Sequence, residues 1–124
     1  MAEAAMKLRT QIMFQGEMED AITLWSRAFP DAQREGTNPC RLLIAGQELA
    51  LFDSPPMHEF TFTPSISLLV ECESEAELSR LAEILAGGGA VLMPQGAYDF
   101  SPCYIWLTDR FGVSWQLMVP PEAA

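Results

Sequence analysis

The chain has 124 residues, of which 49% are hydrophobic, and its formal net charge is −10. This length suits one domain with a sizeable core, and the apolar content argues against intrinsic disorder. An acidic surface repels phosphate backbones and anionic lipids, so we expect neither nucleic acid nor a membrane among the partners. No apolar run approaches the roughly 20 residues of a bilayer span, and the acidic N-terminus is not typical of a signal peptide.

The three cysteines, Cys40, Cys72 and Cys103, are odd in number and far apart in the sequence. Their spacing matches neither a disulfide framework nor a metal knuckle, and none has a histidine at a fixed distance. We therefore expect reduced thiols in a cytoplasmic protein. Cys72 and Cys103 are better interpreted as small core residues than as nucleophiles.

The first half of the chain predicts a strand, a helix and a strand pair. Residues 8–14 alternate, with Thr10, Ile12 and Phe14 on one face. Residues 17–29 follow as an amphipathic helix with an acidic first turn, and Pro30 ends it. Further strands are expected near residues 33–34, over residues 41–45 and over residues 48–52, with a turn at residues 46–47.

The second half repeats this order after a proline-rich connector. Residues 53–64 hold three prolines and the only histidine, His58. A strand over residues 65–71 precedes a second helix, which begins at a capping box formed by Ser74 and Glu77 and ends at glycines 87–89. A short strand is expected over residues 90–93, and residues 94–101 read either as a loop or as a twisted edge strand.

Residues 105–119 predict a β-hairpin, because β-branched and aromatic residues fill both arms and Asp109 and Gly112 lie in the turn. On the returning arm, alternation places Ser114, Gln116 and Met118 on one face and the apolar Val113, Trp115, Leu117 and Val119 on the other. A strand that is apolar on one face and partly polar on the other lines a pocket or meets water. We therefore look for a site beside this hairpin.

The two halves are related by a constant offset. Phe14 and Val70 end their strands 56 positions apart, and the apolar helix stripe keeps this offset, for example in Trp25 and Leu81. We predict an α+β fold in one domain, residues 1–124, with modules 7–54 and 64–121 and connector 55–63. Two such βαβββ modules would form a cup-shaped mixed β-sheet with the helices outside and a cleft within. Exposed sheet edges favour a homodimer.

Several short motifs resemble those of a known superfamily. They are Gln15-Gly16 before Ala21-Ile22, Phe29-Pro30-Asp31, Gly46-Gln47, residues 66–72 (ISLLVEC) and residues 109–116 (DRFGVSWQ). The chain is similar over about residues 7–121 to the vicinal oxygen chelate superfamily, which includes glyoxalase I, bleomycin-resistance proteins and extradiol dioxygenases. Within it, the PhnB-like branch is most similar, and its domain carries the label 3-demethylubiquinone-9 3-methyltransferase-like. The resemblance implies paired βαβββ modules, a cup-shaped sheet and a homodimer. No glycine-rich strand–turn–helix for a methyl-donor nucleotide is present in the sequence.

The resemblance also implies where a metal would lie, because superfamily enzymes hold one inside the cup with His, Glu or Gln ligands. The corresponding positions here are Thr10 or Gln11, Ala50 or its neighbours, one of residues 65–67, and Gln116. None of them is a histidine or a carboxylate, whereas divalent metals need His, Asp, Glu or Cys ligands. We therefore predict no metal and no other cofactor.

We predict six ligand-binding residues and leave the catalytic residues unassigned. The six are Gln116, Thr10, Phe14, Ser67, Tyr104 and Trp106. Gln116 either orients a polar ligand inside the cup or is a satisfied polar side chain that remains where an ancestor held a ligand.

The remaining candidates are better interpreted without a catalytic role. The aromatic side chains Phe60, Phe62, Tyr104 and Trp106 either stack on a ligand or pack in the core or a dimer interface. His58 and the carboxylates Glu48, Asp53 and Asp99 could act as a general base, but solvated surface groups are the simpler interpretation.

Three functions stay open at this point, and so does the question of whether the protein is an enzyme. The first is a cytoplasmic homodimer that binds a small, partly hydrophobic molecule in its cup without a metal. The second is a metal-dependent lyase or dioxygenase like the characterised superfamily members. The third is a non-catalytic dimeric interaction module in which the cup is closed. The sequence does not identify the ligand.

Overall fold

A computed structural model describes residues 6–121, which form two helices and eight strands. In chain order these are β1 (Thr10–Phe14), α1 (Met18–Ala28), β2 (Gln33–Glu35), β3 (Cys40–Ile44), β4 (Gln47–Asp53), β5 (Ser67–Glu71), α2 (Glu75–Ala86), β6 (Ala90–Tyr98), β7 (Ser101–Thr108) and β8 (Ser114–Val119). The strands form two four-stranded sheets, ordered β1-β4-β3-β2 and β5-β8-β7-β6. In each sheet the first strand runs parallel to the last strand of its module, and the other pairs are antiparallel. The predicted βαβββ repeat and α+β class are confirmed.

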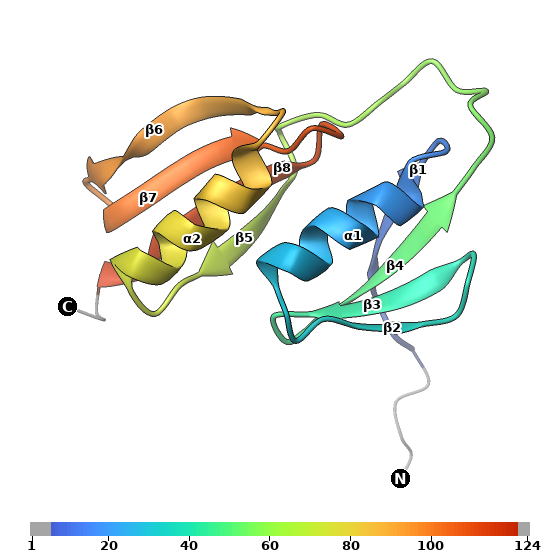
Figure 1. The fold of residues 1–124 in the computed structure, drawn as a ribbon, viewed down its shortest axis with the longest axis horizontal. Helices are drawn as coiled ribbons and strands as arrows, with labels where there is room; N and C mark the ends of the chain where they lie inside the picture. The colour runs from blue at the N-terminus through green and yellow to red at the C-terminus, as the bar shows by residue number, and fades with distance from the viewer. Residues whose placement is uncertain (1–5, 122–124) are drawn as a thin grey trace, which may run out of the picture.

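Each helix covers one face of its own sheet and leaves the opposite face open. Figure 1 shows the modules side by side, with α1 and α2 on the same side of the sheets and the connector arching from β4 to β5. Leu42 of β3 and Leu51 of β4 face α1 and are fully buried, whereas Leu43, the next residue after Leu42 on β3, is exposed. The buried stripes of both helices keep the predicted offset, as Trp25 and Leu81 show. We call the space bounded by the two open faces the cup.

The second helix begins close to where its capping box predicts. The Ser74 hydroxyl accepts a hydrogen bond from the Glu77 amide at 3.1 Å. The Glu77 carboxylate accepts one from the amide of Glu73 at 2.9 Å, one residue before the position that a standard box uses. Two N–H groups at this end of the helix are thereby satisfied, which stabilises the start of α2.

Strand β6 is longer than the four residues expected from the sequence. It continues through Pro94 to Tyr98, so the twisted edge strand is the alternative that the structure contains. Proline is tolerated because β6 lies at the outer edge of its sheet. The register between β6 and β7 shifts at three places, which accounts for the weak alternation in this stretch.

A buried carboxylate joins the two modules. Asp109, in the turn between β7 and β8, is 2% exposed. Its Oδ2 atom accepts hydrogen bonds from the indole N–H groups of Trp25 at 2.9 Å and Trp115 at 3.0 Å. Its Oδ1 atom accepts from the backbone N–H groups of Phe111 at 3.0 Å and Val113 at 3.1 Å. Trp25 lies on α1 of the first module, and Trp115 lies on β8 of the second. The Asp109 carboxylate therefore links the two modules by hydrogen bonds.

Candidate functional site

The face of the second sheet that α2 leaves uncovered carries polar side chains from three strands. On β8, Trp115 and Leu117 belong to the core, while Gln116 between them is half-buried on the opposite face. This confirms the predicted alternation. Gln116 lies in register with Leu69 of β5 and Trp106 of β7, so side chains of all three strands meet on this face.

These side chains form a continuous hydrogen-bonded group, which we call the polar array: Tyr104, Gln116, Ser67, Ser114 and Trp106. The Tyr104 hydroxyl donates to Gln116 Oε1 at 2.6 Å, and Gln116 Nε2 donates to Ser67 Oγ at 3.0 Å. The hydroxyl oxygens of Ser67 and Ser114 are 2.6 Å apart. The indole of Trp106 donates to Ser114 Oγ at 2.9 Å. Four of the six predicted site residues are therefore in contact with one another or with Ser114.

Ser114 was not among the predicted residues, although the sequence contained a signal for it. The alternation of β8 places its side chain on the same face as that of Gln116. Its role depends on the parallel pairing of β5 with β8, which sets Ser67 opposite Ser114. Strand register across 47 positions is not visible in a single sequence.

The other two predicted residues, Thr10 and Phe14, lie outside the polar array. Phe14 is 1% exposed and packs edge-to-face against Trp25 and Phe62, in the core of the first module. Thr10 is exposed at the start of β1 and borders the clefts between the modules. The alternation predicted correctly that the two share a face, but that face is turned towards α1.

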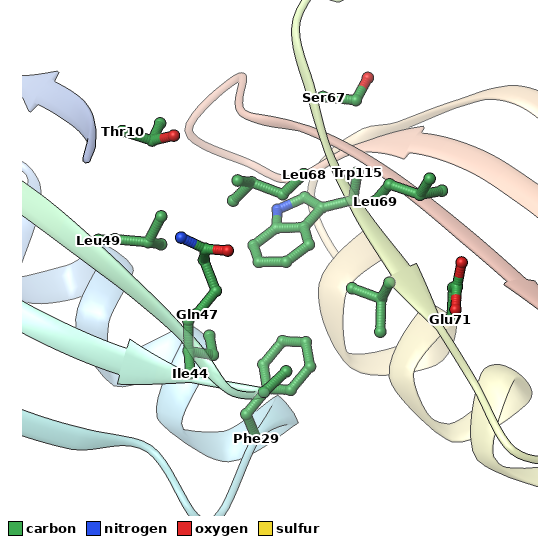
Figure 2. A pocket seen from close by; sticks show the side chains of 12 residues that line it. Thr10, Phe29, Ile44, Gln47, Leu49, Ser67, Leu68, Leu69, Glu71 and Trp115 are labelled. Carbon is green, nitrogen blue, oxygen red and sulfur yellow. The ribbon is translucent and has the colours of Figure 1, made fainter. Parts of the chain in front are cut away.

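Two clefts separate β1 and β4 from β5. The larger has a volume of about 530 Å³ and is shown in Figure 2. There the Gln47 amide lies between Leu49 of its own sheet and Leu68 of β5, whereas Leu69 points away from it. The smaller cleft, of about 250 Å³, lies between β1 and the first residues of β5, and Ser67 and Ser114 of the polar array border it.

Few titratable groups lie near the polar array. Burial, and to a smaller degree the neighbouring Tyr98, raises the pKa of Tyr104, so its phenol is protonated at neutral pH and can donate. His58 is exposed on the connector and stacks on Phe60. Glu48 pairs with Arg9 and Arg41 on the open face of the other sheet. His58 and Glu48 are therefore surface residues and do not surround a reacting centre.

The three cysteines are buried in the core, as expected for Cys72 and Cys103. Burial raises the pKa of Cys72 to about 11, so this side chain is a neutral thiol at physiological pH. We expect no reaction of the folded protein with 5,5′-dithiobis(2-nitrobenzoate) at pH 8 and release of three thiolate equivalents in guanidinium chloride. The absorbance of the released nitrothiobenzoate measures this, and a fast phase before unfolding would contradict it.

The residues at the superfamily's metal positions do not fit a divalent metal. Gln116 is already engaged by Tyr104 and Ser67, and Thr10 lies outside the polar array. Among residues 6–121, no group of three or more His, Cys, Asp or Glu side chains is placed to hold an ion. One amide and a few hydroxyls do not provide the donors that zinc, nickel or iron require.

The two βαβββ modules and their strand order define an α+β protein of the glyoxalase/bleomycin-resistance fold. The profile of the family described as 3-demethylubiquinone-9 3-methyltransferase matches residues 6–118, and the chain belongs to this family. It is thereby part of the PhnB-like branch of the superfamily.

One solved structure supports the family assignment, and two more distant ones share the fold. The PhnB protein from Bacillus cereus is 37% identical and has a TM-score of 0.84, with 92% of this chain and 99% of that chain covered. Protein PA1353 from Pseudomonas aeruginosa is 23% identical, has a TM-score of 0.81, and covers 94% of this chain and 98% of its own. A glyoxylase/bleomycin resistance protein/dioxygenase domain from a Frankia species shares the fold at 14% identity, a TM-score of 0.69 and coverages of 95% and 99%.

A search among curated protein sequences gave no significant match. Neither helix within residues 6–121 has the length and apolar character of a membrane span.

Proposed function

We propose that this chain binds a small, partly hydrophobic molecule in its cup, without a metal. The observation that carries the proposal is the polar array itself, because a few convergent polar groups among apolar side chains are typical of ligand sites. Aromatic rings flank it: Phe100 lies 4.7 Å and Tyr98 5.5 Å from the Tyr104 ring, centroid to centroid. Leu69, beside Gln116, is 56% exposed and offers apolar contact.

We further propose that the protein is a cytoplasmic homodimer. Val91 and Leu92 are exposed on β6, the outer edge strand of the second sheet, and a second copy packed there would remove this apolar surface from water. Three buried, unbridged cysteines suit a reducing compartment.

Methyl transfer, which the family's description names, is not part of the proposal. A methyl-donor nucleotide would be held at a glycine-rich turn between a strand and the start of a helix. Glycines 87–89 lie instead after the end of α2 and lead into β6. Within residues 6–121 the glycine-rich turn is therefore on the wrong side of its helix for this use.

A ligand screen by thermal unfolding tests the proposal. A compound present at a hundred times its dissociation constant is expected to add about 2.7 kcal/mol to the free energy of unfolding. Gln116→Ala should weaken a compound bound at the polar array by roughly tenfold, since about 1.4 kcal/mol of hydrogen bonding is lost. Titration calorimetry of both proteins measures the difference.

Glu83→Ala is the matched control, because Glu83 is exposed on α2, away from the open sheet faces, and lies outside the polar array. We expect it to bind a screened compound as tightly as the original protein does. The proposal fails if no compound raises the melting temperature. It also fails if Gln116→Ala and Glu83→Ala bind every stabilising compound equally well.

A further inference from the structure

The hydrogen-bond directions within the polar array are determined by its two ends. At one end, the indole N–H of Trp106 can only donate, so Ser114 Oγ accepts. Ser114 is 2% exposed, and within residues 6–121 its only other partner is Ser67 Oγ. A buried hydroxyl hydrogen needs an acceptor, so Ser114 donates to Ser67.

The other end is determined by Tyr104. This residue is 4% exposed, and the one hydrogen bond of its hydroxyl among the described residues is to Gln116 Oε1. Tyr104 therefore donates, and the Gln116 amide must direct its oxygen towards Tyr104 and its nitrogen towards Ser67. The opposite amide orientation would leave the buried phenol hydrogen without an acceptor. Gln116 Nε2 consequently donates to Ser67 Oγ.

Both chains of donors end on the same oxygen atom. A serine hydroxyl has two acceptor positions and one hydrogen, and the two positions of Ser67 are occupied by Ser114 and Gln116. The Ser67 hydrogen has no acceptor within residues 6–121. Ser67 is half-buried and borders both clefts, but in Figure 2 its hydroxyl points away from the larger one. We therefore assign its hydrogen to the smaller cleft, of about 250 Å³. The two incoming hydrogen bonds polarise its hydroxyl and strengthen the bond that it donates.

The lining of this cleft decides which acceptor suits Ser67. It carries no charged side chain: the lining residues are Thr10, Gln11, Ile12, Met13, Thr61, Phe62, Thr63, Ile66, Ser67, Leu68, Val113 and Ser114. A charged ligand group would lose its hydration there without an ionic partner, and the net charge of −10 repels anions further. A neutral acceptor oxygen beside an apolar group fits both the hydroxyl and the lining.

We propose that Ser67 is the hydrogen-bond donor of this site and that its ligand presents a neutral carbonyl oxygen, of a ketone or an amide, on a partly hydrophobic body. This inference rests on the proposed small-molecule function and specifies its chemistry.

Nitrogen-15 NMR titrations with four probes of similar size test it. Acetophenone has the neutral carbonyl, ethylbenzene has no acceptor, benzoate is an anion and benzylamine is a cation. Acetophenone is expected to give saturable shifts at the amides of β5 and β8 and to bind more tightly than the other three. Ser67→Ala should weaken acetophenone by about 2- to 10-fold, the value of one neutral hydrogen bond, and leave ethylbenzene unchanged. Ser67→Thr keeps the hydroxyl and should restore binding.

The possible failures separate the two proposals. If benzoate, benzylamine or ethylbenzene binds at least as tightly as acetophenone, the carbonyl inference is overturned while small-molecule binding stands. The same holds if Ser67→Ala weakens no probe or weakens all equally. If no probe gives saturable shifts but the thermal screen yields a stabilising compound, the carbonyl inference is overturned and small-molecule binding stands; if neither experiment detects binding, both proposals fall. The comparison of probes on the unmodified protein decides the matter even if Ser67→Ala does not fold.

Discussion

Replacing Asp109 with alanine is expected to lower the free energy of unfolding by about 4 kcal/mol or more, since each buried donor left without an acceptor costs about 1–3 kcal/mol. Asp109 is the acceptor for four N–H groups, two from indoles and two from the backbone. Water entering the space left by the carboxylate would accept hydrogen bonds from some of these N–H groups. The expected loss is therefore close to about 1 kcal/mol for each donor, the lower end of that range. Typical domains are stable by about 5–15 kcal/mol, so this variant would be marginal.

Denaturation in urea, followed by tryptophan fluorescence, measures the effect. The emission is well suited to this, because Trp25 and Trp115 themselves donate to the carboxylate and are buried in the folded protein. We expect a lower midpoint for Asp109→Ala. A shift of the emission to longer wavelength before unfolding would show water entering between the modules.

Asp109→Asn is the sharper test, because it preserves shape and removes only the second acceptor oxygen. Whichever way the amide turns, its NH₂ group faces a pair of N–H donors, either the indoles or the backbone of Phe111 and Val113. The loss should therefore be comparable to that of alanine. Asp99→Asn, at an exposed position before β7, is the matched control and should leave the midpoint unchanged. An Asp109→Asn protein as stable as the original would disprove the role assigned to the carboxylate.

The role of Asp109 could not be predicted from the sequence. An aspartate followed by a glycine between two apolar runs indicates a turn, and that much is confirmed. Its second role depends on Trp25 of α1, 84 positions away, which also packs edge-to-face against Trp115 of β8. Contacts across such distances leave no periodic pattern in one chain. The stripes of α1 and α2 and the alternation of β8 were predictable because burial repeats with the period of the element itself.

In the candidate site, too, local periodicity was predictable and contacts between distant segments were not. Gln116 was identifiable as the polar residue between Trp115 and Leu117, and alternation correctly placed it opposite the core. Alternation places Phe14 on the same face of β1 as Thr10, but it does not determine whether that face turns towards a helix or towards the cup. The structure turns it towards α1, where an aromatic side chain buries more surface. Which apolar face a helix covers depends on packing that a single strand does not reveal.

Replacing Gly89 with alanine is the second substitution expected to lower the stability strongly. A Cβ atom at Gly89 would lie 2.0 Å from the carbonyl oxygen of Thr108 and 2.8 Å from the carbonyl carbon of Asp109. Both atoms belong to the backbone, so no side chain can move aside, and the chain after α2 must separate from the β7–β8 turn. We expect Gly89→Ala to cost about 3 kcal/mol, the upper part of the usual range for overpacked positions. Urea denaturation measures it.

The same glycine run contains the matched control. A Cβ atom at Gly87 would meet nothing closer than the Ile84 carbonyl oxygen at 3.8 Å, and its backbone is extended, a conformation open to any residue. Gly87→Ala should therefore change stability by less than about 1 kcal/mol, towards stabilisation, because alanine restricts the unfolded chain. Equal losses for the two variants would mean that alanine is harmful in this turn generally and would contradict the close approach. Gly89 lies against the backbone of Asp109, so both substitutions disturb the same contact between the chain after α2 and the β7–β8 turn. The double variant Gly89→Ala, Asp109→Asn should therefore lose less free energy of unfolding than the sum of the two single losses.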